Sequence, residues 1–517
     1  MKERSRTEYS ILNIMTGIGG YGINTILGFI CRIVFTQCLA KDYLGVNGLF
    51  TNILTMLSLA ELGVGSAIVF ALYKPLAEHD RKKIASLVEL YGKAYKFIGI
   101  LVAVIGLVLM PFLHVIIREE PHIFESIYLL YLINLFNIAS TYFFSYRSSL
   151  LIAAQMNYLV SGINYIITIG QSIFQMIFLI QTHNYLVYLL IQTAGTFIYN
   201  VLISHIAVKK FPYIKDKDIE PLPKQEKKKI FENVRDLMMY KVSGLLVNST
   251  DNILITFLKG LATTGVASNY TLLVSTLNSL LAQVFNGLTA SVGNHNAIES
   301  NEKKVEMFSF LNMMNFWIFG WAALGIIFCS SDIIKLCFGS SYVLSIKIPI
   351  IMAVNFYTVG MMNAVWTYKH TLGLFHYGRL LQIITGILNI IFSIVLGSKL
   401  GLFGILFATF LSRAFTNLWY DPYAVFVHGF GKTPIQYLKQ YIKYLIVLFV
   451  DAGICKITFS FIKANLLVRV ISEIFLCSVI VNIVFIIVFY RTPEFSKFKA
   501  VVKNVIYILK NKIRRGN

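Results

Sequence analysis

Charge is scarce in this 517-residue chain, since 14% of the residues are Asp, Glu, Lys or Arg while 56% are hydrophobic. Soluble domains contain roughly 25% charged and roughly 45–50% apolar residues, so a soluble fold is excluded. Apolar runs of about 20 residues recur from end to end, and a helix of that length crosses the roughly 30 Å hydrocarbon core of a bilayer. The sequence therefore predicts an all-α polytopic membrane protein.

Sequence features of enzymes and metal proteins are also missing. The six cysteines form no CxxC pair and have no histidine at ligand spacing, so neither a metal centre nor a redox motif is expected. The sequence has no Gly-rich Walker loop, which excludes ATP as the direct energy source, and no histidine or carboxylate cluster with an acid–base pattern. We therefore expect a protein that is not an enzyme and that needs no cofactor and no metal.

Apolar windows bounded by polar residues predict fourteen membrane-spanning helices, of which the second and the eighth are the most polar. The first span lacks a cleavage site and is expected to be retained. The spans are expected at about residues 12–38, 45–73, 95–117, 125–153, 158–180, 185–207, 236–258, 264–293, 308–329, 347–369, 379–397, 402–427, 441–461 and 469–490.

Acidic residues are few, and the 46 Lys and Arg exceed the 25 Asp and Glu by 21. Most of this excess lies in segments 74–96, 208–235 and 491–515, which all fall on one side of the membrane when the N-terminus is cytoplasmic. The positive-inside rule then places both termini in the cytoplasm, and we expect location in the cytoplasmic membrane. Contact with anionic inner-leaflet lipid explains the basic balance without nucleic acid.

Polar segments divide the chain into parts. The proline-containing stretch 208–235 is predicted to be a cytoplasmic linker between two lobes of six helices each. Apolar residues at helical spacing among lysines predict an amphipathic tail helix on the inner surface, although an ordinary basic anchor has the same charge pattern. The predicted parts are 1–207 for the N-lobe, 208–235 for the linker, 236–427 for the C-lobe, 428–490 for helices thirteen and fourteen, and 491–517 for the tail.

A weak internal repeat supports the two lobes. Because a six-helix unit has an even number of spans, both copies enter the membrane in the same direction, which gives a parallel repeat around a central cleft. Coincidence among apolar segments is the alternative explanation. An offset of 220 aligns Gly45-Val46 with Gly265-Val266 and Thr51 with Thr271, and an offset of 222 aligns Tyr146-Arg147 with Tyr368-Lys369.

Two local patterns resemble a known superfamily of exporters. The second helix runs from Tyr43-Leu44-Gly45 to Glu61-Leu62-Gly63, and the fourth ends in Tyr146-Arg147-Ser148-Ser149-Leu150. With the arrangement of twelve plus two helices, they resemble the multidrug/oligosaccharidyl-lipid/polysaccharide exporter superfamily, and within it the bacterial polysaccharide (Wzx-type) flippases. The resemblance implies a V-shaped, MATE-like arrangement of the two lobes.

The resemblance also implies a function. It implies translocation of an undecaprenyl-pyrophosphate-linked oligosaccharide for cell-surface polysaccharide biosynthesis, with glycosyltransferases or a polymerase of the same pathway as partners. Three alternatives stay open: a cation-coupled multidrug exporter, a flippase for the peptidoglycan lipid precursor, and a membrane scaffold that transports nothing. The first helix carries Arg32 and no acidic residue within its span, which disfavours a cationic cargo.

Basic residues inside the membrane are candidates for substrate binding, because a central Arg costs roughly 2.5–3.5 kcal/mol on insertion scales. Arg32 and Arg413 are the deepest, and guanidinium groups suit the oxygens of a pyrophosphate. Each could instead fix a helix within its own lobe. Lys241 can extend its side chain to the cytoplasmic surface, and Arg147 is explained equally by topology.

Two acidic residues are candidates for gating or coupling. Glu61 lies among small residues in the second helix, where it could pair with a basic residue or bind a proton. The offset of 220 aligns Arg32 with Asn252, next to Asp251. We therefore predict that Arg32 and Asp251 form a labile ion pair that holds an outer gate shut, unless each pairs within its own lobe.

Overall fold

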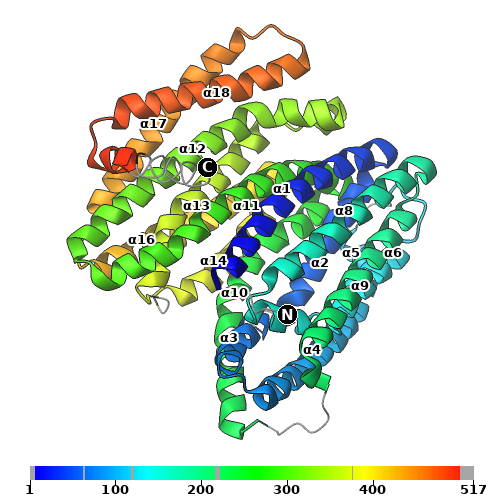
Figure 1. Cartoon of the computed structure of the whole chain (residues 1–517). Helices are drawn as coiled ribbons and strands as arrows, with labels where there is room; N and C mark the ends of the chain where they lie inside the picture. Colours follow the sequence, from blue (N-terminus) through cyan, green and yellow to red (C-terminus); the bar gives the residue numbers. More distant parts are fainter. Residues whose placement is uncertain are drawn as a thin grey trace, which may run out of the picture. The chain divides into compact units, whose positions relative to one another are not determined.

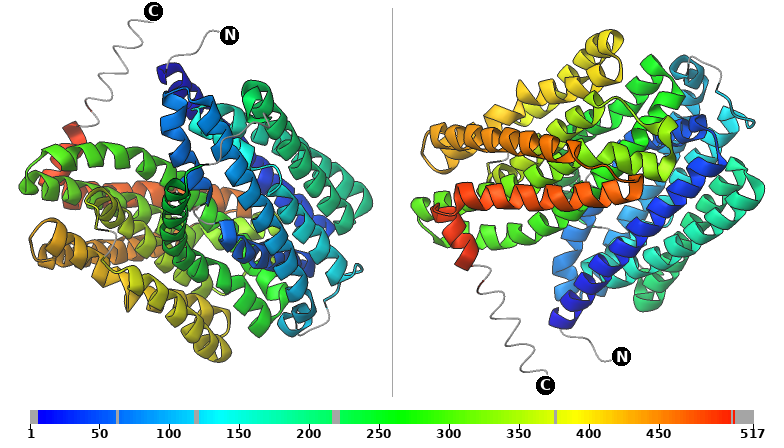
Figure 2. Two further views of the ribbon diagram at one scale, coloured as in Figure 1. Left: turned by 90° about the horizontal axis from the view of Figure 1, so that it is seen from below. Right: turned by 90° about the horizontal axis from the view of Figure 1, so that it is seen from above.

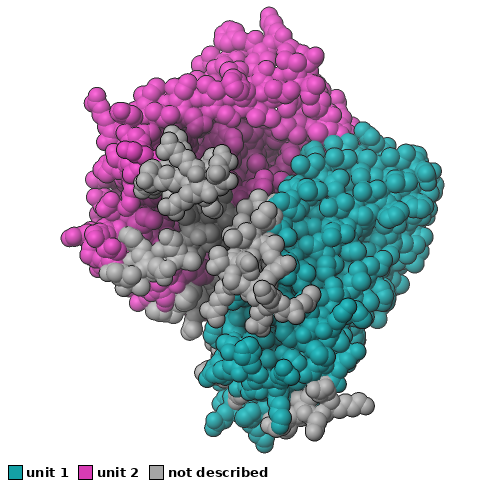
Figure 3. Space-filling model, in the orientation of Figure 1, with its two compact units in different colours: residues 1–268 teal, residues 269–517 magenta. Residues whose placement is uncertain are grey.

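The computed structural model describes residues 6–61, 64–117, 121–215, 222–374, 377–500 and 503. Within these residues every regular element is a helix, as predicted (Figure 1). Contacts between the helices divide the chain into two compact units, Met1–Ser268 and Asn269–Asn517, which are coloured separately in Figure 3. The lobe boundaries proposed from the sequence stay a prediction.

The helices of unit 1 are mostly long, and short 3₁₀ turns separate some of them. They are α1 (Arg6–Cys38), α2 (Lys41–Leu57), η1 (Ser58–Glu61), α3 (Val64–Ala77), α4 (Arg81–Leu109), η2 (Met110–Phe112), α5 (Leu113–Ile116), α6 (Ile127–Thr141), α7 (Tyr146–Ala153), α8 (Asn157–Thr182), α9 (Tyr185–Lys210), η3 (Pro212–Lys215) and α10 (Lys224–Lys259). Unit 1 also takes in the first residues of the helix that follows α10.

Unit 2 contains the remaining helices. They are α11 (Leu261–Ile298), α12 (Asn301–Phe338), η4 (Ser340–Tyr342), α13 (Lys347–Thr371), α14 (Arg379–Leu400), α15 (Leu402–Ala414), α16 (Asn417–Ala424), the π-helical η5 (Val425–Gly429), α17 (Ile435–Ser460) and α18 (Leu466–Phe489). Of these, α11 begins in unit 1 and continues into unit 2.

Nine helices among the described residues are long and apolar enough to cross a membrane, and the pair α6 and α7, bent by 45°, would make a tenth. The predicted class of multi-pass membrane protein is therefore confirmed, while the count of fourteen spans stays a prediction. The two most polar predicted spans are not among the nine. One of them, the second, is interrupted where the 3₁₀ turn η1 follows α2.

The linker is shorter than the sequence suggests. Helix α9 continues to Lys210 and α10 begins at Lys224, so the two helices are separated by residues 211–223. Pro223 occupies the position before the first turn of α10, where a missing N–H costs nothing, and the Lys, Gln and Glu that follow are good helix formers. Polarity alone therefore does not mark the end of a helix here.

Close packing of α1 on α8 and of α8 on α9 builds one side of unit 1 (Figure 2). Gly20 of α1 lies against the ring of Tyr165 of α8, so closely that a Cβ at this position would overlap the ring. Near the other end of α1, Phe35 makes edge-on contacts with Tyr185 and Tyr188 of α9, at centroid distances of 5.6 and 5.1 Å. Aromatic pairs of this geometry stabilise a helix contact beyond the burial of their area.

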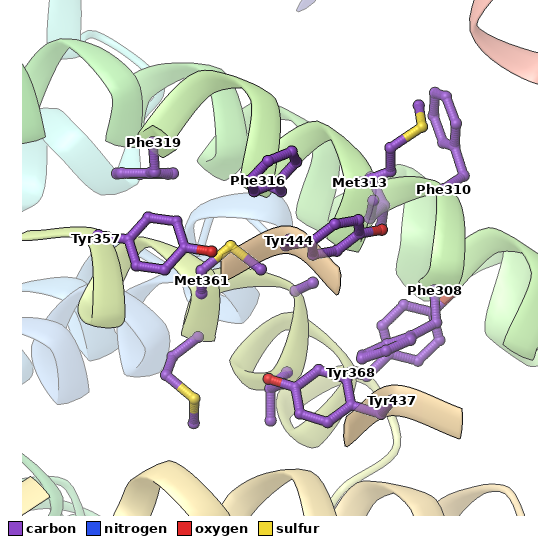
Figure 4. Packing of buried hydrophobic residues seen from close by; sticks show 14 of the residues in the cluster. Phe308, Phe310, Met313, Phe316, Phe319, Tyr357, Met361, Tyr368, Tyr437 and Tyr444 are labelled. Carbon is purple, nitrogen blue, oxygen red and sulfur yellow. The ribbon is translucent and has the colours of Figure 1, made fainter. Parts of the chain in front are cut away.

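Unit 2 has a core rich in aromatic residues, contributed mainly by α12, α13, α17 and α18 (Figure 4). The rings of Phe316 and Tyr444 are stacked with centroids 4.4 Å apart, and those of Trp317 and Phe485 with centroids 4.2 Å apart. Each pair joins α12 to one of the two last helices. Helices thirteen and fourteen of the predicted plan therefore belong to this core.

The start of the predicted tail is part of the same core. Phe495 is buried, and Phe498 contacts Trp317 edge-on at 4.9 Å. Lys497 lies 3.3 Å from a carboxylate oxygen of Glu306. The remainder of the predicted amphipathic helix, beyond residue 500 and apart from Lys503, lies outside the described residues.

Candidate functional site

Two helix turns meet within unit 1. Helices α1 and α2 are joined after Cys38, and α10 and α11 are joined at Gly260, whose φ of 82° falls in the left-handed region that glycine adopts readily. The first residues of α11, from Leu261 to Ser268, belong to unit 1 and contact the start of α2. These are the helix turns that the offset of 220 residues aligns with each other.

Glycines allow the two turns to touch. A Cβ at Gly45 would overlap the backbone carbonyl of Leu261, and a Cβ at Gly265 would overlap the backbone carbonyl of Lys41. The two glycines are equivalent in the repeat, and so are Leu261 and Lys41, since each pair differs by 220 in number. The contact is therefore reciprocal, as expected where equivalent segments meet around a two-fold axis.

A second reciprocal contact lies one turn further along the helices. The guanidinium of Arg32 on α1 donates a hydrogen bond to Oγ of Ser268 on α11. In the equivalent direction, the side chain of Asn252 on α10 lies near Gly48 on α2, 3.7 Å from the position of a Cβ built there. Arg32 corresponds to Asn252 and Gly48 to Ser268, so the charged member of the set is present on one side of the axis only.

Aromatic and acidic side chains surround Arg32. Tyr185 and Tyr188 lie close enough for its positive charge to act on both hydroxyls, and their rings are stacked at 5.9 Å. Beyond them, Tyr43 donates a hydrogen bond of 2.5 Å to Glu125. The arrangement provides a cation beside stacked rings and hydroxyl groups, a combination that suits an anionic, polar ligand.

Asp251 lies on α10 and is half-buried, and it belongs to unit 1 together with Arg32. The predicted ion pair between these two residues stays a prediction. Arg413 is half-buried in the last turn of α15. Lys241 lies within α10, and its side chain is outside the described residues. These candidates are distributed over both units, and their roles in substrate binding stay predictions.

Glu61 and Arg147 each have a partner inside unit 1. Glu61, at the end of η1, accepts a hydrogen bond of 3.0 Å from the buried hydroxyl of Tyr95. Arg147 donates a hydrogen bond of 2.6 Å to Ser204 of α9, and its guanidinium lies 5.3 Å from the ring centroid of Tyr146. Both contacts fix helices of unit 1 to each other, whatever else these residues do.

Sequence reasoning did not find the ion pair in unit 2. Lys369 of α13 lies 2.6 Å from Asp421 of α16, and Trp366 donates a hydrogen bond of 3.1 Å to the other carboxylate oxygen. Lys369 is the repeat equivalent of Arg147, which contacts the sixth predicted span, whereas Lys369 contacts the twelfth. The offset of 222 residues was therefore a usable signal for a partner on the last span of each lobe.

Taken together, the helical architecture and the reciprocal contacts are those of a membrane transporter built from two repeats. The chain has the fold of the multidrug/oligosaccharidyl-lipid/polysaccharide (MOP) superfamily, as the sequence resemblance predicted. No protein-family model and no curated protein sequence matches it. The likeness is carried by solved structures.

The similar structures include a flippase and two exporters. The lipid II flippase MurJ in an inward closed conformation is 15% identical, with a TM-score of 0.67 over 92% of this chain and 99% of that chain. An inward-facing MATE multidrug-resistance transporter is 13% identical, with a TM-score of 0.53 over 77% of this chain and 93% of that chain. A mutant of the Vibrio cholerae MATE transporter VcmN is 14% identical, with a TM-score of 0.55 over 81% and 97%.

Proposed function

We propose that the chain is a flippase that moves an undecaprenyl-pyrophosphate-linked oligosaccharide from the inner to the outer leaflet of the cytoplasmic membrane. Alternating access of two lobes would drive the cargo across. The match to a flippase extends over 92% of this chain, against 77% and 81% for the two exporters. This wider match favours a lipid-linked cargo over a small drug.

The contact of Arg32 with Ser268 is the observation that carries the proposal. A guanidinium has five N–H donors, so a pyrophosphate can accept hydrogen bonds from it in bidentate fashion. The hydroxyl of Ser268 is neutral and a weaker partner than a phosphate oxygen. Arrival of the cargo would therefore draw Arg32 away from Ser268 and loosen the contact between the two helix turns. With both termini cytoplasmic, these turns lie at the outer face and act as the outer gate.

A flippase for the peptidoglycan lipid precursor is the second candidate, because the MurJ structure carries that activity in its name. Both candidates bring an anionic lipid-linked sugar to the same arginine. A multidrug exporter is disfavoured, because Arg32 would repel a cationic drug at the gate. In either flippase, we expect the basic loops to contact anionic inner-leaflet lipid, and glycosyltransferases or a polymerase to supply and consume the cargo.

Replacement of Arg32 tests the proposal in a strain whose surface polysaccharide depends on this protein. Because a hydrogen bond to a charged group contributes about 1.5–3 kcal/mol, we expect Arg32→Ala to lower export roughly 10- to 100-fold. Arg32→Lys should retain part of the activity. Lys93→Ala, which removes an exposed charge paired with Glu89, is the control and should leave export unchanged.

Two results would contradict the proposal. Normal surface polysaccharide in the Arg32→Ala strain, at normal protein abundance, would show that the gate arginine binds no cargo. The choice between the two flippase candidates is made with proteoliposomes that contain either lipid-linked oligosaccharide or the peptidoglycan lipid precursor. Movement of neither lipid, with movement of a cationic dye, would favour the exporter instead.

A further inference from the structure

Unit 2 contains a second group of ionisable residues, far along the chain from the gate. It lies where α12, α17 and α18 contact one another, and α17 and α18 run side by side in Figures 1 and 2. The carboxylates in this group are Asp332, Asp451 and Glu473, and the only basic residue that the described contacts place among them is Arg469.

Arg469 is shared between two carboxylates. Its Nε lies 2.8 Å from an oxygen of Asp332 and 2.9 Å from an oxygen of Glu473. Asp332 and Glu473 are also within hydrogen-bonding reach of each other. Two ionised carboxylates in contact repel, so a single guanidinium does not balance both of them, and one proton on the pair relieves the repulsion.

Two carboxylate oxygens in this group have no partner among the described residues. Glu473 is 1% exposed and its Oε2 accepts no hydrogen bond, and Asp451 is 1% exposed and its Oδ1 accepts none. No described cation pairs with Asp451. An ionised carboxylate without a cation is costly in a membrane interior, and the neutral acid is the form that such a site tolerates.

Three thiols connect the two buried acids. Asp451 lies beside Cys455 and Cys477, whose thiols hydrogen-bond to each other, and Cys329 lies beside both Cys455 and Glu473. All three cysteines are buried and free. The polar groups thus form a continuous file across the contact of α12, α17 and α18.

The file runs from a helix end to the middle of the helices. Arg469, which is half-exposed, is in the first turn of α18, and Glu473 is seven residues from its start at Leu466. Asp451 is nine residues from the end of α17 at Ser460. At about 1.5 Å per residue, Glu473 lies about 10 Å and Asp451 about 14 Å from the helix ends, and half of the hydrocarbon core is about 15 Å thick.

From this arrangement we infer a proton-binding site in unit 2, in which Asp451 and the Asp332–Glu473 pair each hold one proton. Protons reach the site from the end marked by Arg469 and travel along the thiols. Among the described residues, no group of three His, Cys, Asp or Glu has the geometry to hold a metal ion, which favours a proton over a larger cation. The inference holds whether or not the cargo is a lipid-linked sugar.

Infrared spectroscopy of the full-length protein in lipid nanodiscs tests the site directly. At neutral pH an ordinary carboxyl is ionised, because its pKa is about 4, whereas a protonated carboxyl gives a separate C=O band. We expect the wild type to show such a band, and we expect Asp451→Asn and Glu473→Gln each to remove a part of it. Glu89→Gln, at an exposed carboxylate paired with Lys93, is the control and should leave the band unchanged.

The variants are nearly isosteric, so thermal unfolding should stay the same or rise. A band that neither variant reduces would overturn the inference. Loss of the band when sodium replaces potassium would also overturn it, because the acids would then bind a metal cation. If Glu473→Gln does not fold, the band of Asp451→Asn decides alone, since Asp451 has no described ion-pair partner to disrupt.

Discussion

Gly45 and Gly265 leave no room for a side chain, because each faces the backbone of the other helix turn. We expect Gly45→Ala to destabilise the contact by about 1–3 kcal/mol, as other overpacked positions do. Since Gly265 makes the equivalent contact, Gly265→Ala should have an effect of the same size. Thermal unfolding of the purified protein in nanodiscs measures both variants.

Gly28 of α1 provides the matched control, since a Cβ there would meet nothing within 4 Å. Gly28→Ala should leave stability unchanged or raise it by up to about 1 kcal/mol, through the better helix propensity of alanine. A melting temperature of Gly45→Ala equal to that of Gly28→Ala would mean that the two helix turns do not touch as described.

The repeat-equivalent residues Lys369 and Arg147 should differ sharply on replacement. Lys369→Met leaves the carboxylate of Asp421 buried without its cation, which costs about 3–5 kcal/mol. Arg147→Ala removes a hydrogen bond to the neutral Ser204 and should cost about 1 kcal/mol. Denaturation of the purified variants compares the two losses.

A second variant separates charge from packing at Lys369. Combined with Asp421→Asn, Lys369→Met should recover most of the stability, because no uncompensated charge remains and Trp366 keeps an acceptor. If the double variant is as unstable as Lys369→Met alone, the loss comes from packing and not from the buried charge.

At the scale of whole helices, the end of the chain tests how unit 2 is closed. Phe495 is buried beside Phe485 in the core of unit 2, whereas the chain beyond residue 503 lies outside the described residues. We therefore expect Phe495→Ala to destabilise unit 2 by about 3–5 kcal/mol. Truncation after residue 503 should preserve folding and membrane insertion, which protease resistance of the inserted protein measures.

This division changes the prediction made from the sequence, which would allow deletion from residue 495 onward without loss of the fold. The spacing of apolar residues among lysines predicts a surface helix equally well whether its first residues are free or buried. A truncation after 503 that prevented insertion would show that the tail is structural along its whole length.

The sequence was most informative where structure follows from local pattern. Apolar length predicts the long helices, and the offset of 220 residues brings Gly45 into register with Gly265. It could not predict the interruption of the second span at η1 or the pair of Lys369 with Asp421, because each depends on contacts with distant helices. Asp451 and Glu473 were missed for the same reason, since their significance depends on burial that spacing does not reveal.

At the scale of the whole molecule, the reciprocal contacts make a lock possible. The Cβ of Ser268 lies 4.0 Å from the position of a Cβ built on Gly48, its repeat equivalent. Disulfide-bonded cysteines have Cβ atoms about 3.5–4.5 Å apart. Gly48→Cys together with Ser268→Cys, with Cys31 and Cys38 replaced by Ser to prevent mispairing, should therefore form a disulfide under oxidising conditions.

If the two helix turns must separate for cargo to leave at the outer face, the lock should stop export. We expect at least a tenfold loss of export in the oxidised double variant and its recovery on reduction, measured as movement of lipid-linked oligosaccharide in proteoliposomes. Each single cysteine variant, oxidised in the same way, is the control and should remain active. Full export by a protein whose cross-link is complete on a gel would mean that the turns stay in contact throughout the cycle, and that the gate lies elsewhere.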